Sequence, residues 1–200
     1  KGMIYMKKII RRVVYSAISV LIFVCGKFLL REDYLSFLKW WLTVFYIGII
    51  FMPVTSLIFE NFHDKGYLFS KAIGLAVSGY IMWLAASLHI MKFNTVNSLI
   101  SIAICLILNL LLLWFRLRSK KSASAKPGRK FTAENLDTML GEELLFLAVF
   151  LIFSYIRAFK PEAYGTEKFM DYGFMTSMLR SDYMPPQDFW YSGTSLNYYY

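Results

Sequence analysis

Two carboxylates near the end of the chain are spaced for acid–base chemistry. Glu167 and Asp171 are four residues apart, so a helix places them on one face, one turn from each other. Lys168 and Arg180 lie in the same segment. A carboxylate can accept the proton of an attacking hydroxyl, and a cation can stabilise the charge that develops on a departing phosphate. Asp171 with Arg180 or Lys168 could supply these two roles.

The same residues also fit a simpler interpretation, the solvated face of an amphipathic helix, and residue types alone favour it. The opposite face is apolar and could rest in a membrane interface. Pro185 and Pro186 end that helix. A polar and aromatic run follows, in which Trp190, Tyr198 and Tyr199 could stack on sugar rings or form an interfacial aromatic belt. The other predicted substrate-binding positions of this run are Asp188 and Asn197.

The elements that must position these residues are membrane helices. Of the 200 residues, 58% are hydrophobic and only 18% charged, against about 25% charged in an average soluble domain. A bilayer needs about 20 apolar residues per helix. The sequence therefore predicts an all-α, polytopic transmembrane protein with about five spans and a juxtamembrane amphipathic helix. The predicted spans are 13–30, 37–59, 72–90, 96–115 and the shorter 144–159.

The basic residues indicate the orientation of the spans. With the N-terminus in the cytoplasm, residues 1–12, 60–71 and 116–130 lie inside and hold 14 of the 22 Lys and Arg residues. Five crossings then place residues 160–200 outside. The expected location is the cell membrane, with the bilayer as a partner. The net charge of +9 reflects these span ends, so we expect no nucleic-acid binding.

The composition divides the chain into three parts. Residues 1–118 form a four-helix membrane region, 119–141 a basic cytoplasmic linker, and 142–200 the fifth span with its extracytoplasmic segment. Thr132 begins a sequence that suggests a short interfacial helix before the fifth span. Both ends look truncated, so we expect the N-terminal part of a longer protein.

A few small and polar residues interrupt the predicted spans. Ser70, Gly74 and Ser78 form a ridge of small residues on which another helix can pack closely. Asn109 should donate a hydrogen bond to a neighbouring helix. The two cysteines lie in apolar runs and the two histidines are far apart, so no metal-ligand spacing or disulfide framework is present.

The segment from Pro161 to Tyr200 resembles the YYY membrane protein family, whose members are mostly of unknown function. The resemblance rests on an ordered set of residues, ending in the tyrosine triplet: Pro161-Glu162, Gly165-Thr166-Glu167-Lys168, Met170-Asp171, Pro185-Pro186, Asp188, Trp190, Gly193 and Asn197-Tyr198-Tyr199-Tyr200. That family is similar to GT-C glycosyltransferases of the protein O-mannosyltransferase type. The resemblance therefore implies a GT-C-like fold of which this chain is the N-terminal part.

The resemblance also implies a reaction and a site. GT-C enzymes use a polyprenyl-phosphate-linked sugar at the outer face of the membrane, and an essential acid lies on their first long extracytoplasmic loop. Asp171 matches that acid and would deprotonate the acceptor hydroxyl, with Glu167 orienting it. Tyr172 follows Asp171, so the adjacent Asp-Glu pair of many members is absent. Some members hold a divalent cation and others none, so a cofactor stays open.

Two other functions fit a membrane protein of this layout. A transporter or flippase for lipid-linked glycans predicts acids and cations buried within the spans, and the first four predicted spans have no central charge. A non-catalytic scaffold predicts that Glu167 and Asp171 tolerate substitution. The acceptor and the sugar stay unknown from the sequence.

Overall fold

The described part of the chain is helical, as the sequence predicts. The computed structural model describes residues 2–120, 132–160, 162, 164–165, 167–191 and 193–197. Within these ranges the only β pairing is an isolated bridge between Gln187 and Ser195. The elements are α1 (Gly2–Leu30), the 3-10 turn η1 (Arg31–Asp33), α2 (Tyr34–Ile58), α3 (Tyr67–Ser87), α4 (Thr95–Lys120), α5 (Ala133–Ala158) and α6 (Lys168–Arg180).

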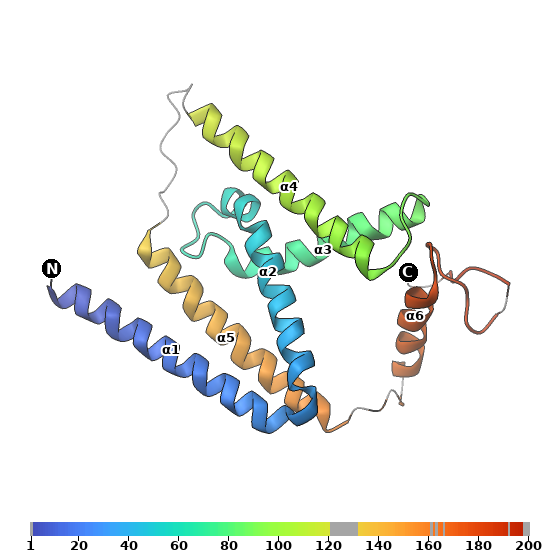
Figure 1. Cartoon of the computed structure of the whole chain (residues 1–200), viewed down its shortest axis with the longest axis horizontal. Coiled ribbons are helices and arrows are strands. Elements are labelled where there is room, and N and C mark those ends of the chain that lie inside the picture. Colours follow the sequence, from blue (N-terminus) through green and yellow to red (C-terminus); the bar gives the residue numbers. More distant parts are fainter. Residues whose placement is uncertain are drawn as a thin grey trace.

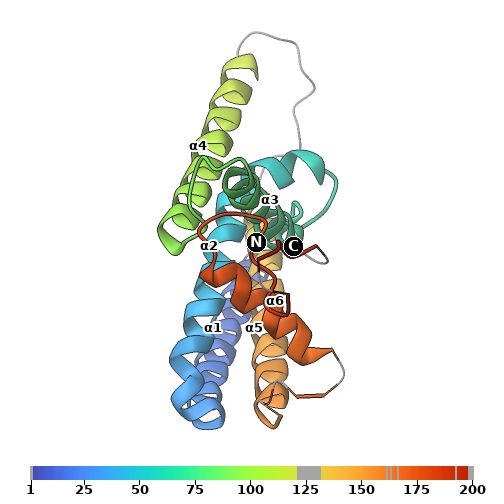
Figure 2. The same cartoon turned by 90° about the vertical axis from the view of Figure 1, so that its right-hand side faces the viewer.

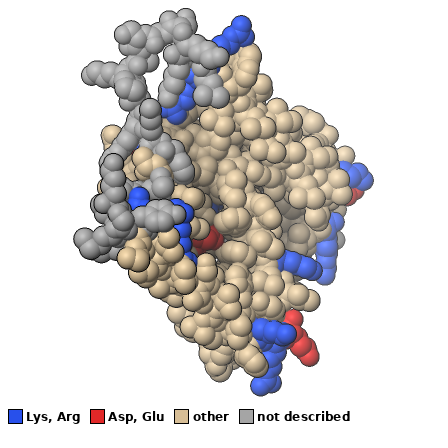
Figure 3. Space-filling view, turned by 60° about the vertical axis from the view of Figure 1, so that its left-hand side comes forward, with Lys and Arg blue, Asp and Glu red and all other residues tan. Residues whose placement is uncertain are grey.

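Four apolar stretches are long enough to cross a membrane. The first, Lys8–Ile58, contains most of α1 and all of α2, and the chain reverses between them at η1 (Figure 1). The other three lie in α3, α4 and α5. Large apolar side chains are exposed along all five helices, and Figure 3 shows an extended uncharged surface with charged groups mainly toward its margins. Such a surface is typical of a protein in lipid, and a polytopic membrane protein is confirmed.

Small residues allow the close crossing of α2 and α3. Ser70, Gly74 and Ser78 are all buried, and a Cβ atom on Gly74 would overlap the side chain of Ile47. A Cβ atom on Gly48 of α2 would likewise lie only 3.2 Å from the hydroxyl oxygen of Ser70. The predicted ridge is therefore confirmed as a packing surface.

The second packing unit joins α1 to α5. Leu30 and Phe37, on either side of η1, form a core with Leu147 and Leu151 of α5. Phe37 and Phe150 stack with ring centroids 5.0 Å apart. The two helices run side by side in the same direction, with α1 extending beyond the start of α5, and their ends lie together (Figure 1). This pairing brings the N-terminal arginines beside the first turns of α5.

The boundaries of α3 and α5 differ from the predictions. No separate short helix precedes the fifth span, because α5 is continuous from Ala133, where Thr132 and Asn135 form a reciprocal capping box. The third helix begins at Tyr67, so Lys71 is a buried helix residue, whereas the sequence placed it in a loop. With these helix boundaries, charged residues such as Lys71 lie inside the helix bundle.

The predicted role of Asn109 is wrong. Its amide nitrogen donates to the Cys105 carbonyl of the same helix, at 2.9 Å, and not to a neighbouring helix. Its buried amide oxygen has no hydrogen-bond partner among the described residues. A polar side chain in a membrane helix can bond back to its own preceding turn, and here that local option is the one used.

Candidate functional site

The predicted carboxylates lie at the start of α6. Glu167 is the N-cap of this helix and Asp171 is in its first turn, and the Asp171 amide donates to the Glu167 carbonyl at 3.0 Å. Both side chains are exposed, and so is that of Lys168. No hydrogen bond or ion pair of the Asp171 carboxylate occurs within the described ranges. This arrangement leaves Asp171 available to an external group.

The segment after α6 folds back on the helix through aromatic contacts. Trp190 lies edge-on to Phe174 and Phe169, at centroid distances of 6.1 and 6.5 Å, and Phe189 packs where Gly173 has no side chain. Asp188 accepts hydrogen bonds from the amides of Trp190 and Tyr191, at 2.8 and 3.0 Å. Asp188 and Trp190 therefore have structural roles in this turn, whatever they bind. Trp190 stays 60% exposed, which leaves a ring face for a ligand.

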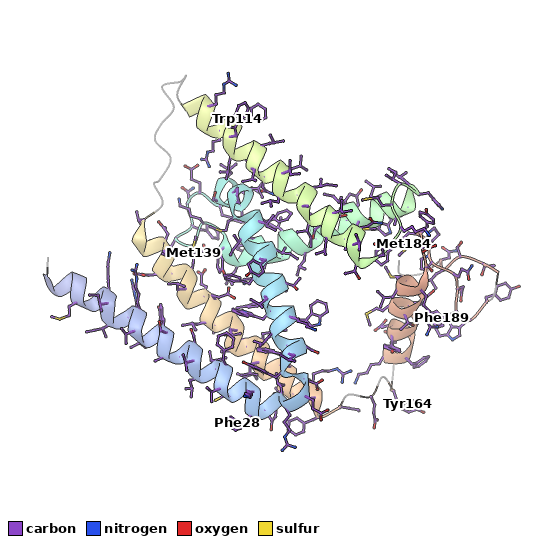
Figure 4. All side chains as sticks on the ribbon, viewed as in Figure 1. Phe28, Trp114, Met139, Tyr164, Met184 and Phe189 are labelled. Carbon is purple, nitrogen blue, oxygen red and sulfur yellow. The ribbon has the colours of Figure 1, made fainter. Side chains whose placement is uncertain are left out.

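The same segment is anchored on the turn between α3 and α4. Met184 is 1% exposed and packs on Met82 and Ala86 of α3 (Figure 4). The Phe93 amide donates to the Asp182 carbonyl at 2.6 Å, and Lys92 forms an ion pair with the Asp182 carboxylate at 2.9 Å. This hydrogen-bonded carboxylate raises the pKa of Lys92. In Figure 1, α6 lies on the same side of the molecule as the turn between α3 and α4, apart from α1, α2 and α5. Figure 2 views the molecule from this side, and α6 there lies in front of these helices.

A cavity of about 510 Å³ lies between α6 and the returning segment. Arg180 and Asp188 line it, together with polar groups that include Ser177 and Asp182. Asp171 and Glu167 do not. Arg180 is nine residues after Asp171, which is about 14 Å along a helix axis. The structure therefore brings together two pairs, Glu167 with Asp171 and Arg180 with Asp188, but keeps the pairs apart.

The remaining predicted site residues do not join either of these two pairs in the described part of the chain. Asn197 is exposed. Tyr198 and Tyr199 lie outside the described residues. Within the described ranges, no group of three or more His, Cys, Asp or Glu side chains is close enough to hold a metal ion.

A buried polar cluster, missed by the sequence analysis, ties three helices together. The Glu143 carboxylate of α5 accepts hydrogen bonds from Lys71 Nζ at 2.6 Å, Tyr67 Oη at 2.5 Å and Trp41 Nε1 at 2.8 Å. Lys71 is 4% exposed, and Glu143 is 9% exposed. Rings of Phe45, Tyr67 and Phe146 surround the Lys71 ammonium at 4.4–5.6 Å. The cluster satisfies each buried charge with an opposite charge and with hydrogen bonds.

Comparison with known proteins identifies a family. A family model described as "Uncharacterized membrane protein (DUF2298)" matches residues 77–200, more than half of the chain. The chain belongs to this family. No curated protein and no solved structure matches it. The match supports a membrane protein and assigns no activity to it.

The DUF2298 match covers only part of the buried cluster. Glu143 and the entire α6 segment fall within the matched residues, whereas Trp41, Tyr67 and Lys71 precede them. The sequence held one signal for the cluster: Glu142 and Glu143 directly precede the long apolar run that begins at Leu144, within the same helix. The position of the partners needed the three-dimensional packing of α2 and α3 on α5.

Proposed function

We propose that this membrane protein is a GT-C-like glycosyltransferase. It takes a sugar from a polyprenyl-phosphate donor at the outer face of the cell membrane and transfers it to a hydroxyl acceptor. In this orientation the N-terminus is cytoplasmic and residues 160–200 are extracytoplasmic. The observation that carries the proposal is the exposed carboxylate of Asp171, which has no partner among the described residues and lies at the position that resembles the essential acid of GT-C enzymes.

The proposed reaction is a direct displacement at the sugar carbon. Asp171 accepts the proton of the acceptor hydroxyl, whose oxygen attacks the anomeric carbon. The bond from that carbon to the phosphate oxygen breaks, and the phosphate leaves with the electron pair. Attack opposite the leaving group inverts the configuration of the sugar.

The geometry of α6 favours Lys168 over Arg180 as the cation nearest to the reacting phosphate. Lys168 precedes Asp171 by three residues, so the two side chains can meet on adjacent turns. Arg180 is too far along the helix to contact a phosphate bonded to the same sugar. It lines the cavity with Asp188, where a more distant part of a substrate could bind.

Replacement of Asp171 in the full-length protein tests the proposal. Asp171→Asn keeps the size of the side chain and removes the base, so transfer from a polyprenyl-phosphate sugar should fall by about 10²–10⁴-fold. Glu162→Gln, at another exposed acid of the same segment, is the matched control and should retain activity. Full transfer by Asp171→Asn would overturn the assignment.

A second candidate function, transport of lipid-linked glycans, is favoured by one observation. The buried Lys71–Glu143 pair lies inside apolar helices, where charged residues often mark a substrate path. Transport predicts that vesicles containing Asp171→Asn still move a fluorescent lipid-linked glycan between leaflets. Movement of the glycan by wild-type protein that shows no sugar transfer would favour the transporter.

A further inference from the structure

A second cavity lies among α1, α2 and α5, away from α6. Its volume is about 370 Å³. Arg12, Ser16 and Ser19 of α1 provide much of its polar lining, and Phe23, Leu144 and Leu147 provide apolar lining. Nothing in the proposed reaction uses this cavity.

The lining changes character along the helices. Arg12 is close to the first turns of α5, and its side chain is 47% exposed. Phe23 is eleven residues further along α1, which is about 16 Å deeper along the helix. The cavity therefore has a polar, partly open end and an apolar end within the membrane-spanning part of the bundle.

The polar end carries an excess of positive charge. Arg11 and Arg12 both bond to the carboxylate of Asp137, whose side chain is fully buried. One carboxylate cannot neutralise two guanidinium groups. Among the described residues, Glu143 is the one carboxylate that lines the cavity, and Lys71 neutralises it at 2.6 Å.

We propose that this cavity binds an anionic phospholipid, with its phosphate at Arg12 and the Ser16 hydroxyl and an acyl chain along Phe23 and Leu147. Arginine binds phosphate through several directed hydrogen bonds, and the hydroxyls add neutral donors. A free phosphate ion fits the polar end only, whereas a lipid fills both ends. The proposal does not depend on the glycosyltransferase assignment, because no residue of α6 lines this cavity.

Two arginine variants of the full-length protein make a matched test. Arg12→Gln removes the guanidinium that lines the cavity, and Arg11 still pairs with Asp137. Arg11→Gln removes an arginine that shares the same carboxylate but does not line the cavity. Delipidated protein is titrated with phosphatidylglycerol, phosphatidylcholine or inorganic phosphate, and binding is read by thermal stabilisation and native mass spectrometry.

The expected result is a preference for phosphatidylglycerol that Arg12→Gln reduces by about tenfold or more, the size expected for a lost hydrogen bond to a charged group. Arg11→Gln should retain most of the preference. Ser16→Trp fills the cavity without touching Asp137, and it should reduce binding even if Arg12→Gln folds poorly. Equal binding of phosphatidylcholine, equal losses for both arginine variants, or binding of inorganic phosphate as tight as that of phosphatidylglycerol would each overturn the proposal.

Discussion

Two acidic residues of the same chain lie in opposite surroundings. Glu143 is 9% exposed and accepts three hydrogen bonds from α2 and α3. Asp171 is exposed at the start of α6, and no described residue bonds its carboxylate. Both belong to the region that defines the DUF2298 family.

These surroundings suit different roles: Glu143 binds α2 and α3 to α5, whereas the Asp171 carboxylate is accessible to a substrate. A buried charge is tolerated only when its partners compensate the lost hydration, so a fully bonded Glu143 has little capacity left for a substrate. An exposed carboxylate has low energetic value for the fold, and its hydrogen-bonding capacity stays available. The comparison therefore fits a structural role for Glu143 and the proposed catalytic role of Asp171.

The largest expected effect on stability comes from removing the buried carboxylate. Glu143→Ala leaves the Lys71 ammonium inside the bundle without its counter-charge, and we expect a loss of about 3–5 kcal/mol in the free energy of unfolding. Unfolding by sodium dodecyl sulfate in mixed micelles measures it. The adjacent Glu142 is the control, because one of its buried carboxylate oxygens has no partner among the described residues. A Glu142→Ala variant as unstable as Glu143→Ala would contradict the proposed role of the cluster.

A double substitution tests whether Lys71 and Glu143 act as a pair. Lys71→Met alone leaves the Glu143 carboxylate buried without its cation, so it should also destabilise by about 3–5 kcal/mol. In Lys71→Met/Glu143→Gln no charge remains, and Tyr67 and Trp41 can still donate to the amide oxygen. The loss of stability in the double variant should therefore be smaller, by at least about 1 kcal/mol, than the sum of the losses in Lys71→Met and in a Glu143→Gln single variant. Additive losses would show that the two residues stabilise the helices separately.

The helices could be predicted from the sequence, and so could the packing ridge of small residues on α3. Both follow from the types and spacing of residues that are close together in the chain. Apolar length alone defines a span, and residues such as Gly74 mark a close crossing. The helix at Glu167 and Asp171 was also predictable from spacing. A helix start at Thr132 was also predicted, but its continuity with the fifth span was not.

The buried cluster and the separation of the two halves of the predicted site depend on long-range packing. Lys71 and Glu143 are far apart in sequence and meet only through the packing of α3 on α5. The sequence spacing correctly placed Asp171 and Arg180 on one helix. Their residue types also suggested that both contact the same part of a substrate. The rise of the helix places them about 14 Å apart instead.

A smaller effect is expected at the crossing of α2 and α3, which supports the buried cluster from the side. A side chain at Gly74 would overlap Ile47, so Gly74→Val should destabilise by about 1–3 kcal/mol through overpacking. Gly79 of the same helix has no heavy atom within 4 Å of an added Cβ. Gly79→Ala should be neutral or slightly stabilising in the same unfolding measurement. Equal effects at both glycines would show that the crossing is looser than the described geometry.

The smallest expected effect on stability belongs to Asp171 itself. Its exposed side chain has no described partner, so Asp171→Ala should change the free energy of unfolding by no more than about 0.5 kcal/mol. The same purified variant should lose sugar transfer, since the base is gone. A loss of more than about 1 kcal/mol would mean that the carboxylate supports the fold of α6, as at an N-terminal helix turn. Inactivity of Asp171 variants would then report a damaged helix, and the contrast with Glu143 would no longer separate chemistry from stability.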